Sequence, residues 1–542
     1  HTLTEILRDE WGFDGYVMSD WGAVNDRVKG LAAGLELEMP SSNGVRDAQI
    51  VAAVRGGTLD EAVLDKAVAR ILNIVFRYAD VQHPEAKFDR AAHHALAAEL
   101  EKECAVLLQN KGALPLARAA KIAYIGGFAE KPRYQGGGSS HINASAVTSA
   151  LDAARVNGTD VVYAEGFPAD RDETDEAKFA AAVEAARAAD AAIIFAGLPD
   201  SFESEGYDRS HMRLPECQDR LIARVAAVQP NTVVVLHNGS PVECPWAESV
   251  NAVLEMYLGG QGVGAAADAL LYGDANPSGR LPETFPYQLE DNPSHLNFPG
   301  DGKNVEYAEG VFVGYRYYDK KKMAVRWPFG HGLSYTTFEY SNVRVSADVL
   351  NDGSTVTVYA DIKNTGDRAG REVVQLYVAD RTGTAGRPEK ELKGFAKVAL
   401  EPGETKTVEL SVDARSLSWY SEALGGWYAA PGRYELLVGH SSRDIRGAAA
   451  VEFRTEKLLP FHVDENTTVG ELLADPRTAS SVRQMARQFM DTIAPAAEDS
   501  ADAAKEAVSD EMARQMMDNM PLRGLRSFGA FPEGALERMI AD

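Results

Sequence analysis

The spacing of hydrophobic positions changes three times along the chain, and the first stretch alternates helical and strand-like patterns. Apolar positions within 3–7 predict a helical face, and a short apolar run over 13–18 leads into a serine and an aspartate. Helical patterns over 24–33 and 60–78 lie on either side of a second short apolar run at 35–40. This alternation of strand and helix predicts βα units.

From about 92 to 290 the pattern is typical of a doubly wound α/β domain. A helical pattern over 92–109 precedes an apolar strand at 121–125, and alanine-rich helices such as 176–189 separate the later apolar runs. Those runs are continuous, as expected of parallel strands that are buried on both faces. They lie at 160–163, 191–197, 231–236 and 251–257.

From about 335 to 453 the hydrophobic period becomes two. Apolar residues occupy every second position over 356–362, 374–378, 408–412 and 434–438, and turn residues such as Pro402-Gly403 separate the runs. The pattern predicts a β-sandwich.

The last stretch, from about 456, has a helical, acidic and methionine-rich pattern. Seven of the twelve methionines fall there, and residues 495–508 are of low complexity. A helical core that packs on the other domains is favoured over an adaptable partner surface. The methionines are Met485, Met490, Met512, Met516, Met517, Met520 and Met539.

Charge and composition exclude several classes of function. The chain has 542 residues and a formal net charge of −25, which repels phosphate backbones, so we expect no nucleic acid partner. No stretch approaches 18 apolar residues and no signal peptide is visible, so we expect no membrane partner and a cytoplasmic location. Cys104, Cys217 and Cys244 are too few for a disulfide framework and predict buried, reduced thiols.

The run GFDGYVMSDW places Asp20 at the carboxyl end of a predicted strand, directly before Trp21. Sites in parallel α/β units form at that end of the strands, so Asp20 is a candidate nucleophile or general base beside an aromatic platform. The alternative is that Ser19 or Asp20 caps a helix that begins near Gly22. The local pattern by itself favours the cap.

The run SFESEGYDR gathers Glu203, Glu205 and Asp208 after a predicted buried strand, with Arg209 behind them. Like charges this close are expected to raise one another's pKa, which would make one carboxyl a usable acid near neutral pH. A solvated acidic loop is the alternative, and the local pattern favours it.

A glycine-rich loop, RYQGGGSSHIN, would let the backbone approach a ligand closely, and Ser139 is among its hydrogen-bonding residues. A plain polar loop explains the same residues. The loop lacks the spacing of phosphate-binding motifs. Because the chain also lacks metal-ligand spacings and a G-x-S-x-G serine elbow, we expect neither a cofactor nor a serine hydrolase.

Taken in order, these segments resemble glycoside hydrolase family 3, most closely its β-glucosidases. One such string is weak evidence, but eight of them in the family's order are not expected by chance. The resemblance covers about residues 1–453 and rests on LRDEWGFDGYVMSDWGAV, AGLELEMP, LLQNKGALPL, ESEGYDR, NGSPVE, NPSGRLPETFP, EGVFVGYRYYD and PFGHGLSYTTFEY.

The resemblance implies a role for each residue of the site. Asp20 would be the catalytic nucleophile and Glu205 the general acid/base, with Glu203 as the second candidate on the same loop. Trp21 and Ser139 would contact the glucose. Retaining hydrolysis needs two carboxyls about 5–5.5 Å apart, so the two domains that carry them would meet around the sugar.

The fold that the resemblance implies is an α/β multidomain chain with the C-terminal part of a (β/α)₈ barrel. A whole barrel takes about 250 residues, so we expect an N-terminally incomplete chain. The expected domains are the barrel part with the nucleophile (1–79), a linker (80–91), an α/β sandwich domain with a parallel sheet and the acid/base loop (92–290), a connecting segment (291–334), a fibronectin type III-like domain (335–453) and a helical methionine-rich tail (454–542).

The implied activity is removal of terminal non-reducing β-D-glucosyl residues from a small oligosaccharide or aryl β-glucoside, with no cofactor. A homodimer is implied by the resemblance alone. Two alternatives stay open. The same mechanism could act on β-xylosides or α-arabinosides, or the chain could be a catalytically silent fragment or sugar-binding scaffold.

Overall fold

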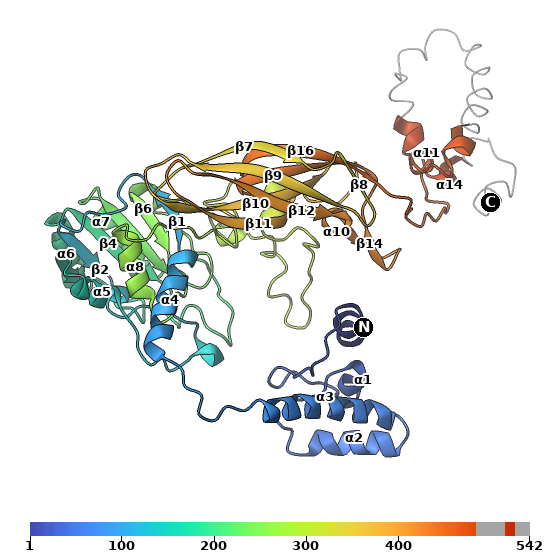
Figure 1. Ribbon diagram of the computed structural model, residues 1–542, viewed down its shortest axis with the longest axis horizontal. Helices are drawn as coiled ribbons and strands as arrows, with labels where there is room; N and C mark the ends of the chain where they lie inside the picture. Colours follow the sequence, from blue (N-terminus) through green and yellow to red (C-terminus); the bar gives the residue numbers. More distant parts are fainter. Residues whose placement is uncertain (484–514, 526–542) are drawn as a thin grey trace, which may run out of the picture. The chain divides into compact units, whose positions relative to one another are not determined.

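The computed structural model describes residues 1–483 and 515–525 and divides into two compact units, His1–Ala91 and Ala92–Asp542 (Figure 1). Every helix that the structure describes is too short or too polar to span a bilayer.

The first unit consists of four helices and two short extended segments. The extended segments meet at one parallel bridge between Met18 and Leu37, so the two apolar runs lie side by side as adjacent strands of βα units do. A small core of Leu31, Ile50, Leu59 and Ala67 joins the helices. The helices are η1 (Thr2–Glu10), which includes i→i−5 hydrogen bonds, α1 (Arg27–Ala33), α2 (Val45–Arg55) and α3 (Glu61–Asp80).

One buried carboxylate connects most of this unit. Glu36 accepts two hydrogen bonds from Arg8 (2.9 and 2.8 Å) and one from Arg70 (2.6 Å). It also accepts the backbone N–H of Val17 at 2.7 Å. Charge-assisted hydrogen bonds to Glu36 therefore hold together helix η1, the first extended segment and α3.

The second unit opens with an α/β domain around a six-stranded sheet in the order β1-β6-β5-β4-β2-β3. Strands β6, β5, β4, β2 and β3 run parallel to one another, whereas the edge strand β1 pairs antiparallel with β6. The sheet that was predicted to be parallel is therefore mixed. The strands are β1 (Val106–Asn110), β2 (Ile122–Ile125), β3 (Val161–Ala164), β4 (Ala191–Gly197), β5 (Thr232–His237) and β6 (Ala252–Glu255).

The prediction of a helix over 92–109 is wrong for the last residues of that range, which form a strand. Helix α4 (Arg90–Cys104) stops before β1, and Leu107 and Leu108 are buried in the sheet's core. A short apolar run fits a buried helix turn and a buried strand equally well, so periodicity could not find this boundary. Cys104, predicted to be buried, is exposed at the end of α4.

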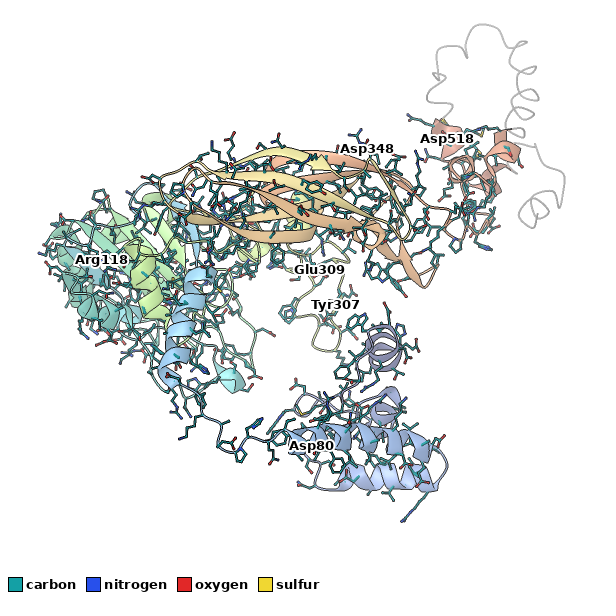
Figure 2. The ribbon with its side chains drawn as sticks, in the orientation of Figure 1. Asp80, Arg118, Tyr307, Glu309, Asp348 and Asp518 are labelled. Carbon is teal, nitrogen blue, oxygen red and sulfur yellow. The ribbon has the colours of Figure 1, made fainter. Side chains whose placement is uncertain are left out.

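Two pairs of helices pack on the sheet. Helix α5 (Ala150–Val156) contacts α8 (Val263–Leu271), and α6 (Glu176–Arg187) contacts α7 (Glu216–Ala226). Arg118, labelled in Figure 2, donates to Asp268 of α8 at 2.9 Å and so ties the segment before β2 to that helix.

The β-sandwich follows helix α9 (Tyr315–Lys320) and consists of a five-stranded sheet, β11-β10-β15-β16-β8, and a three-stranded sheet, β12-β9-β7. The period-two prediction is confirmed, since the apolar positions 356–362 of β9 point into a shared core. The strands are β7 (Phe338–Val345), β8 (Val349–Asn351), β9 (Thr355–Asn364), β10 (Gly370–Asp380), β11 (Glu391–Leu400), β12 (Thr405–Asp413), β15 (Gly432–Ser441) and β16 (Asp444–Arg454), with helix α10 (Ala414–Leu417) and the hairpin β13 (Trp419–Ser421) and β14 (Gly426–Tyr428) inserted before β15.

A buried charge cluster joins the sandwich to the α/β domain. Glu372 of β10 accepts from Arg280 at 2.7 Å and lies 3.2 Å from His440 Nδ1. The other ring nitrogen of His440 lies 2.8 Å from the carbonyl oxygen of Gly332. The two domains are thus connected by paired charges as well as by apolar contacts.

The described part of the tail forms a small cluster of its own. Helices α11 (Val469–Ala474) and α14 (Leu522–Leu525) bury Val469, Leu472 and Leu522, and Met517 and Met520 pack against them. The predicted low-complexity segment 495–508 and the methionines 485, 490, 512 and 539 lie outside the described residues.

Candidate active site

Two loops leave the same edge of the α/β sheet from neighbouring strands. The glycine-rich loop, 133–143, follows β2, and the acidic loop, 199–209, follows β4. Strand β2 pairs with β3 on one side and with β4 on the other, so the direction of strand addition reverses between β2 and β4. The carboxyl edge at such a switch point is where ligands bind in open α/β sheets.

The glycines let the two loops approach closely. A Cβ atom on Gly138, whose φ is +88°, would lie 2.5 Å from the Cβ of Glu205. One on Gly137 would lie 2.6 Å from the Oγ of Ser204. Glycine is therefore required at these two positions because any side chain would push the acidic loop away.

Ser139 and Glu205 join the tips of the two loops. The backbone N–H of Ser139 donates to Glu205 Oε2 at 2.5 Å, and the Ser139 hydroxyl donates to the same oxygen. These two hydrogen bonds favour the charged carboxylate and lower the pKa of Glu205. The expectation that crowded acidic residues raise this pKa is wrong for Glu205, since its closest partners are donors.

Glu203 plays a different part, because it is held by cations and backbone. It accepts from Arg133 Nη1 and from the backbone N–H of Gly239, both at 2.7 Å, and from the hydroxyl of Ser240. Arg133 also donates to the backbone oxygens of Leu198 (2.9 Å) and Glu203 (2.7 Å). With every oxygen occupied, Glu203 is suited to hold the base of the loop and poorly suited to exchange protons with a substrate.

Arg209 fixes the far end of the acidic loop. It donates to the Ser240 hydroxyl at 2.6 Å and to the carbonyl oxygen of Pro241 at 3.2 Å. The loop is thus fastened at both ends to the segment that follows β5, and Glu205 lies exposed between the two fastenings.

In the first unit, Asp20 follows the bridged strand pair. Ser19 exchanges hydrogen bonds with the backbone of Met39, accepting its N–H at 2.8 Å, and this fixes the residue before Asp20. Within the part of the chain that the structure describes, the carboxylate of Asp20 accepts a single hydrogen bond, from the adjacent Trp21 N–H at 2.6 Å, and the Trp21 side chain is 72% exposed.

The alternative that Ser19 or Asp20 caps a helix is wrong. Helix α1 begins at Arg27, five residues later than expected from Gly22, and its cap is Asp26, which accepts the N–H of Lys29 at 3.0 Å. Asp20 is therefore left free for chemistry. Asp20 belongs to the first unit and Glu205 to the second, and their pairing around one sugar stays a prediction.

Sequence reasoning missed Arg133, which connects the two loops at their base. Its position at the start of RYQGGGSSHIN was visible, but nothing in one sequence indicates that Glu203 is its partner 70 residues away. No group of three or more His, Cys, Asp or Glu side chains in the described ranges is arranged to hold a metal ion.

Comparison with protein families covers most of the chain. Residues 1–74 match the glycosyl hydrolase family 3 N terminal domain and residues 105–335 match its C-terminal domain. Residues 372–442 match a fibronectin type III-like domain.

Curated relatives and solved structures agree with these matches. The chain is 46% identical to thermostable beta-glucosidase B of Acetivibrio thermocellus over all of its own length and 71% of that protein. It is 44% identical to an exo-alpha-(1->6)-L-arabinopyranosidase of Bifidobacterium longum, over 89% of this chain and 65% of that one. The crystal structure of a Bifidobacterium adolescentis GH3 beta-glucosidase superposes with a TM-score of 0.83 at 44% identity, covering 89% of this chain and 70% of that one. The chain thus spans about two thirds of the length of these relatives.

Proposed function

The chain belongs to glycoside hydrolase family 3, and from that premise we propose that it carries the catalytic pair of a retaining β-glucosidase. The observation that supports this most directly is the fastening of the acidic loop, which presents Glu205 beside Ser139 at the sheet's switch point. The relatives named beta-glucosidase support the choice of sugar.

In the proposed reaction Asp20 attacks the anomeric carbon while Glu205 donates a proton to the departing glycosidic oxygen. The bond from that carbon to the leaving oxygen breaks, and a covalent ester between the sugar and Asp20 forms. Glu205, now a carboxylate, takes a proton from water, which displaces Asp20 and releases the sugar with its original configuration.

The two hydrogen bonds from Ser139 suit the second half of this cycle. They stabilise Glu205 as a carboxylate, the form that removes a proton from water. For the first half, a bound sugar removes water from around Glu205, and this loss of solvation favours the protonated acid. Ser139 would thus favour Glu205 as the base of the second half, while the loss of solvation favours it as the acid of the first half.

Single substitutions test the proposal with 4-nitrophenyl β-D-glucoside. Asp20→Ala should abolish hydrolysis of this glucoside by the chain. Asp14 is an exposed acid of the same segment, and Asp14→Ala should leave the rate of hydrolysis unchanged. Glu205→Ala should lower kcat about 10²–10⁴-fold. Azide should restore turnover of Glu205→Ala and yield glucosyl azide, since a small anion can replace the base-activated water. If Asp20→Ala keeps the parent's rate, the assignment is wrong.

A second candidate is an α-L-arabinopyranosidase, favoured by the two bifidobacterial relatives of that name at 44% and 42% identity. The same two carboxylates would serve, and only the contacts to the sugar's hydroxyls would differ. The ratio of kcat/KM for the 4-nitrophenyl β-D-glucoside and α-L-arabinopyranoside separates the two candidates.

A further inference from the structure

The carboxyl group of Glu255 connects the ends of two neighbouring strands of the α/β sheet. Glu255 is the last residue of β6, and its side chain is fully buried. One oxygen accepts the side-chain amide of Asn238, the residue after β5, at 3.0 Å, and the other accepts the backbone N–H of Tyr257 at 2.8 Å. Strands β5 and β6 pair in parallel, so Glu255 joins the two segments that leave their carboxyl ends.

The contact with Asn238 leads to the acidic loop. The same amide nitrogen donates to the carbonyl oxygen of Ser240 at 3.0 Å and so fixes the turn between these two residues. From this turn the Gly239 N–H (2.7 Å) and the Ser240 hydroxyl both donate to Glu203. Glu203 lies two positions before Glu205. The place of the candidate acid therefore depends on Asn238 through these contacts.

The contact with Tyr257 leads to the glycine-rich loop. Tyr257 has a φ of +48°, in the left-handed region that residues with a side chain seldom adopt. Its N–H bond to Glu255 and the bond from its hydroxyl to Glu283 (3.1 Å) hold it there. Three residues later, the Gly260 N–H donates to the carbonyl oxygen of Tyr134 at 2.9 Å. The start of the glycine-rich loop is therefore held by a turn that Glu255 holds.

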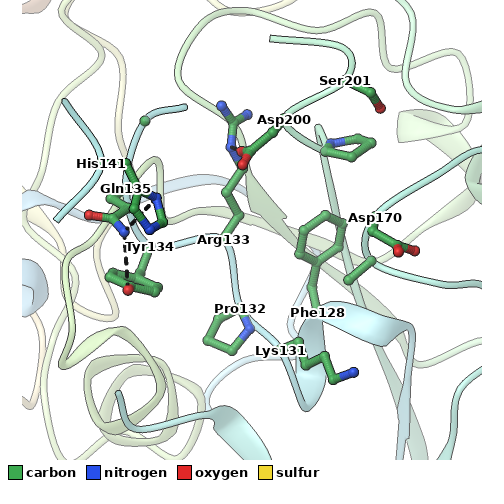
Figure 3. Close-up of a pocket in the computed structure, with 13 residues that line it drawn as sticks. Phe128, Lys131, Pro132, Arg133, Tyr134, Gln135, His141, Asp170, Asp200 and Ser201 are labelled. Atoms are coloured by element: carbon green, nitrogen blue, oxygen red, sulfur yellow. Dashed lines mark hydrogen bonds and ion pairs between the residues drawn. The ribbon is translucent and has the colours of Figure 1, made fainter. Parts of the chain in front are cut away.

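The side chain of Gln135 joins the start of the glycine-rich loop to its end. Its amide nitrogen lies 3.1 Å from the Tyr134 hydroxyl and 3.1 Å from His141 Nδ1 (Figure 3). Its oxygen accepts the N–H of Ile142 at 2.9 Å. Both ends of the loop are thus tied to Tyr134, and Ser139 lies between them.

A carboxyl group at the end of β6 is better explained by the arrangement it imposes than by stability. An apolar side chain would be buried there at lower cost. Burial raises the pKa of Glu255 well above its usual range, which shows how far the group is removed from water. Buried polar groups whose hydrogen bonds are made fix one arrangement of the chain around them.

We propose that Glu255 and Asn238 are positioning residues, which together set the separation of Ser139 and Glu205. The proposal rests on the proposed function, because only there does Glu205 exchange protons with a substrate. Loss of either contact would let the two loops move apart. A misplacement of about 1 Å can slow a reaction about 10²-fold.

Two variants remove the contacts in different ways. An amide nitrogen cannot accept a hydrogen bond, so Glu255→Gln loses one of its two bonds whichever way the amide turns, at almost unchanged volume. Asn238→Ala removes both bonds of the amide nitrogen. The matched control is Gln229→Ala. Gln229 is buried before the other end of β5, and its amide nitrogen donates to the carbonyl oxygens of Ala186 (2.9 Å) and Ala189 (2.7 Å).

Hydrogen exchange of the 542-residue chain tests the positioning without any need for activity. Amides of 133–143 and 199–209 should exchange about tenfold faster in Glu255→Gln and in Asn238→Ala, the effect of losing one buried hydrogen bond. Amides of strand β9 should exchange as in the parent, which shows that the rest of the chain is folded. Gln229→Ala should leave both loops unchanged. Loops that exchange at the parent's rate in both variants would overturn the inference.

Kinetics with two aryl glucosides test whether the acid is what moves. Phenol leaves poorly without a proton, whereas 2,4-dinitrophenolate leaves readily, so a misplaced acid affects the first far more. In both variants kcat/KM for phenyl β-D-glucoside should fall about 10–100-fold and that for 2,4-dinitrophenyl β-D-glucoside should change little. An equal loss on both substrates would show a merely structural role and overturn the inference. A parent chain that hydrolyses neither glucoside would refute the proposed function, while faster exchange of the loops would still uphold their positioning by Glu255.

Discussion

Removing the charge at Glu372 should loosen the join between the α/β domain and the β-sandwich. The side chain is 1% exposed, and its partners Arg280 and His440 are 7% and 15% exposed. Burial raises the pKa of Glu372, but the charges of Arg280 and His440 more than offset this and the pKa is lowered. The carboxylate is therefore stabilised in the folded chain although it is buried.

Glu372→Ala would leave the guanidinium of Arg280 buried with a single acceptor, the carbonyl oxygen of Gly279 at 2.9 Å. Breaking one partner of a buried ion pair costs about 3–5 kcal/mol. The assay is urea unfolding at pH 7 followed by circular dichroism and by hydrogen exchange of the β10 amides, so that local opening of the sandwich is seen separately from global unfolding.

The control is Glu435→Ala, which breaks the ion pair with Arg381 (2.9 Å), whose side chains are 30% and 41% exposed. Its cost should be below about 1 kcal/mol, because solvent screens exposed pairs. If Glu372→Ala costs no more than the control, the charge cluster does not stabilise the join and the reasoning fails.

Three further outcomes concern Ser139, Glu203 and the buried Glu101 of helix α4. Ser139→Ala removes one of two hydrogen bonds that lower the pKa of Glu205, so that pKa should rise and the alkaline limb of the kcat/KM profile for an aryl glucoside should move to higher pH; an unmoved limb would contradict the role of Ser139. Burial raises the pKa of Glu101 to about 8, so the folded chain loses stability relative to the unfolded chain as pH rises from 4.5 to 8, by at most about 1.4 kcal/mol per pH unit. Glu101→Gln should flatten that slope in urea titrations, and an equal slope would show that the acid is solvated. Glu203→Gln should lower kcat for all aryl glucosides alike without azide rescue, whereas rescue by azide would make Glu203 the acid/base instead.

Much of the architecture was predictable because burial leaves a periodic trace. The continuous apolar runs became β3, β4, β5 and β6 within a residue or two, and alternation predicted the sandwich core. The helix end at Cys104 was not predicted, because a continuous apolar run has no period that separates helix from strand. The antiparallel direction of β1 was not predicted either, because strand direction depends on pairing between residues far apart in the sequence.

The roles of Asp20 and Glu205 follow from the family resemblance and stay predictions, because the local pattern favoured a cap for one and a solvated loop for the other. The surroundings of these acids could not be predicted, since they depend on contacts across the fold. Arg133 forms an ion pair with Glu203 but not with Glu205. The hydrogen bonds from Ser139 lower the pKa of Glu205, whereas the sequence predicted that it would be raised. The helix cap at Asp26 likewise could not be told from Asp20 by composition, because both are aspartates near a helix start.

Among the residues that the structure describes, the hydrogen bonds that orient Glu205 and fasten its loop come from loops of a single unit. The orientation of the acid is thus independent of the segment 81–89 that connects the two units. Lengthening or shortening that connection would leave these hydrogen bonds, and hence the orientation of Glu205, unchanged. The first unit could therefore be exchanged for another without rebuilding the loops that orient Glu205.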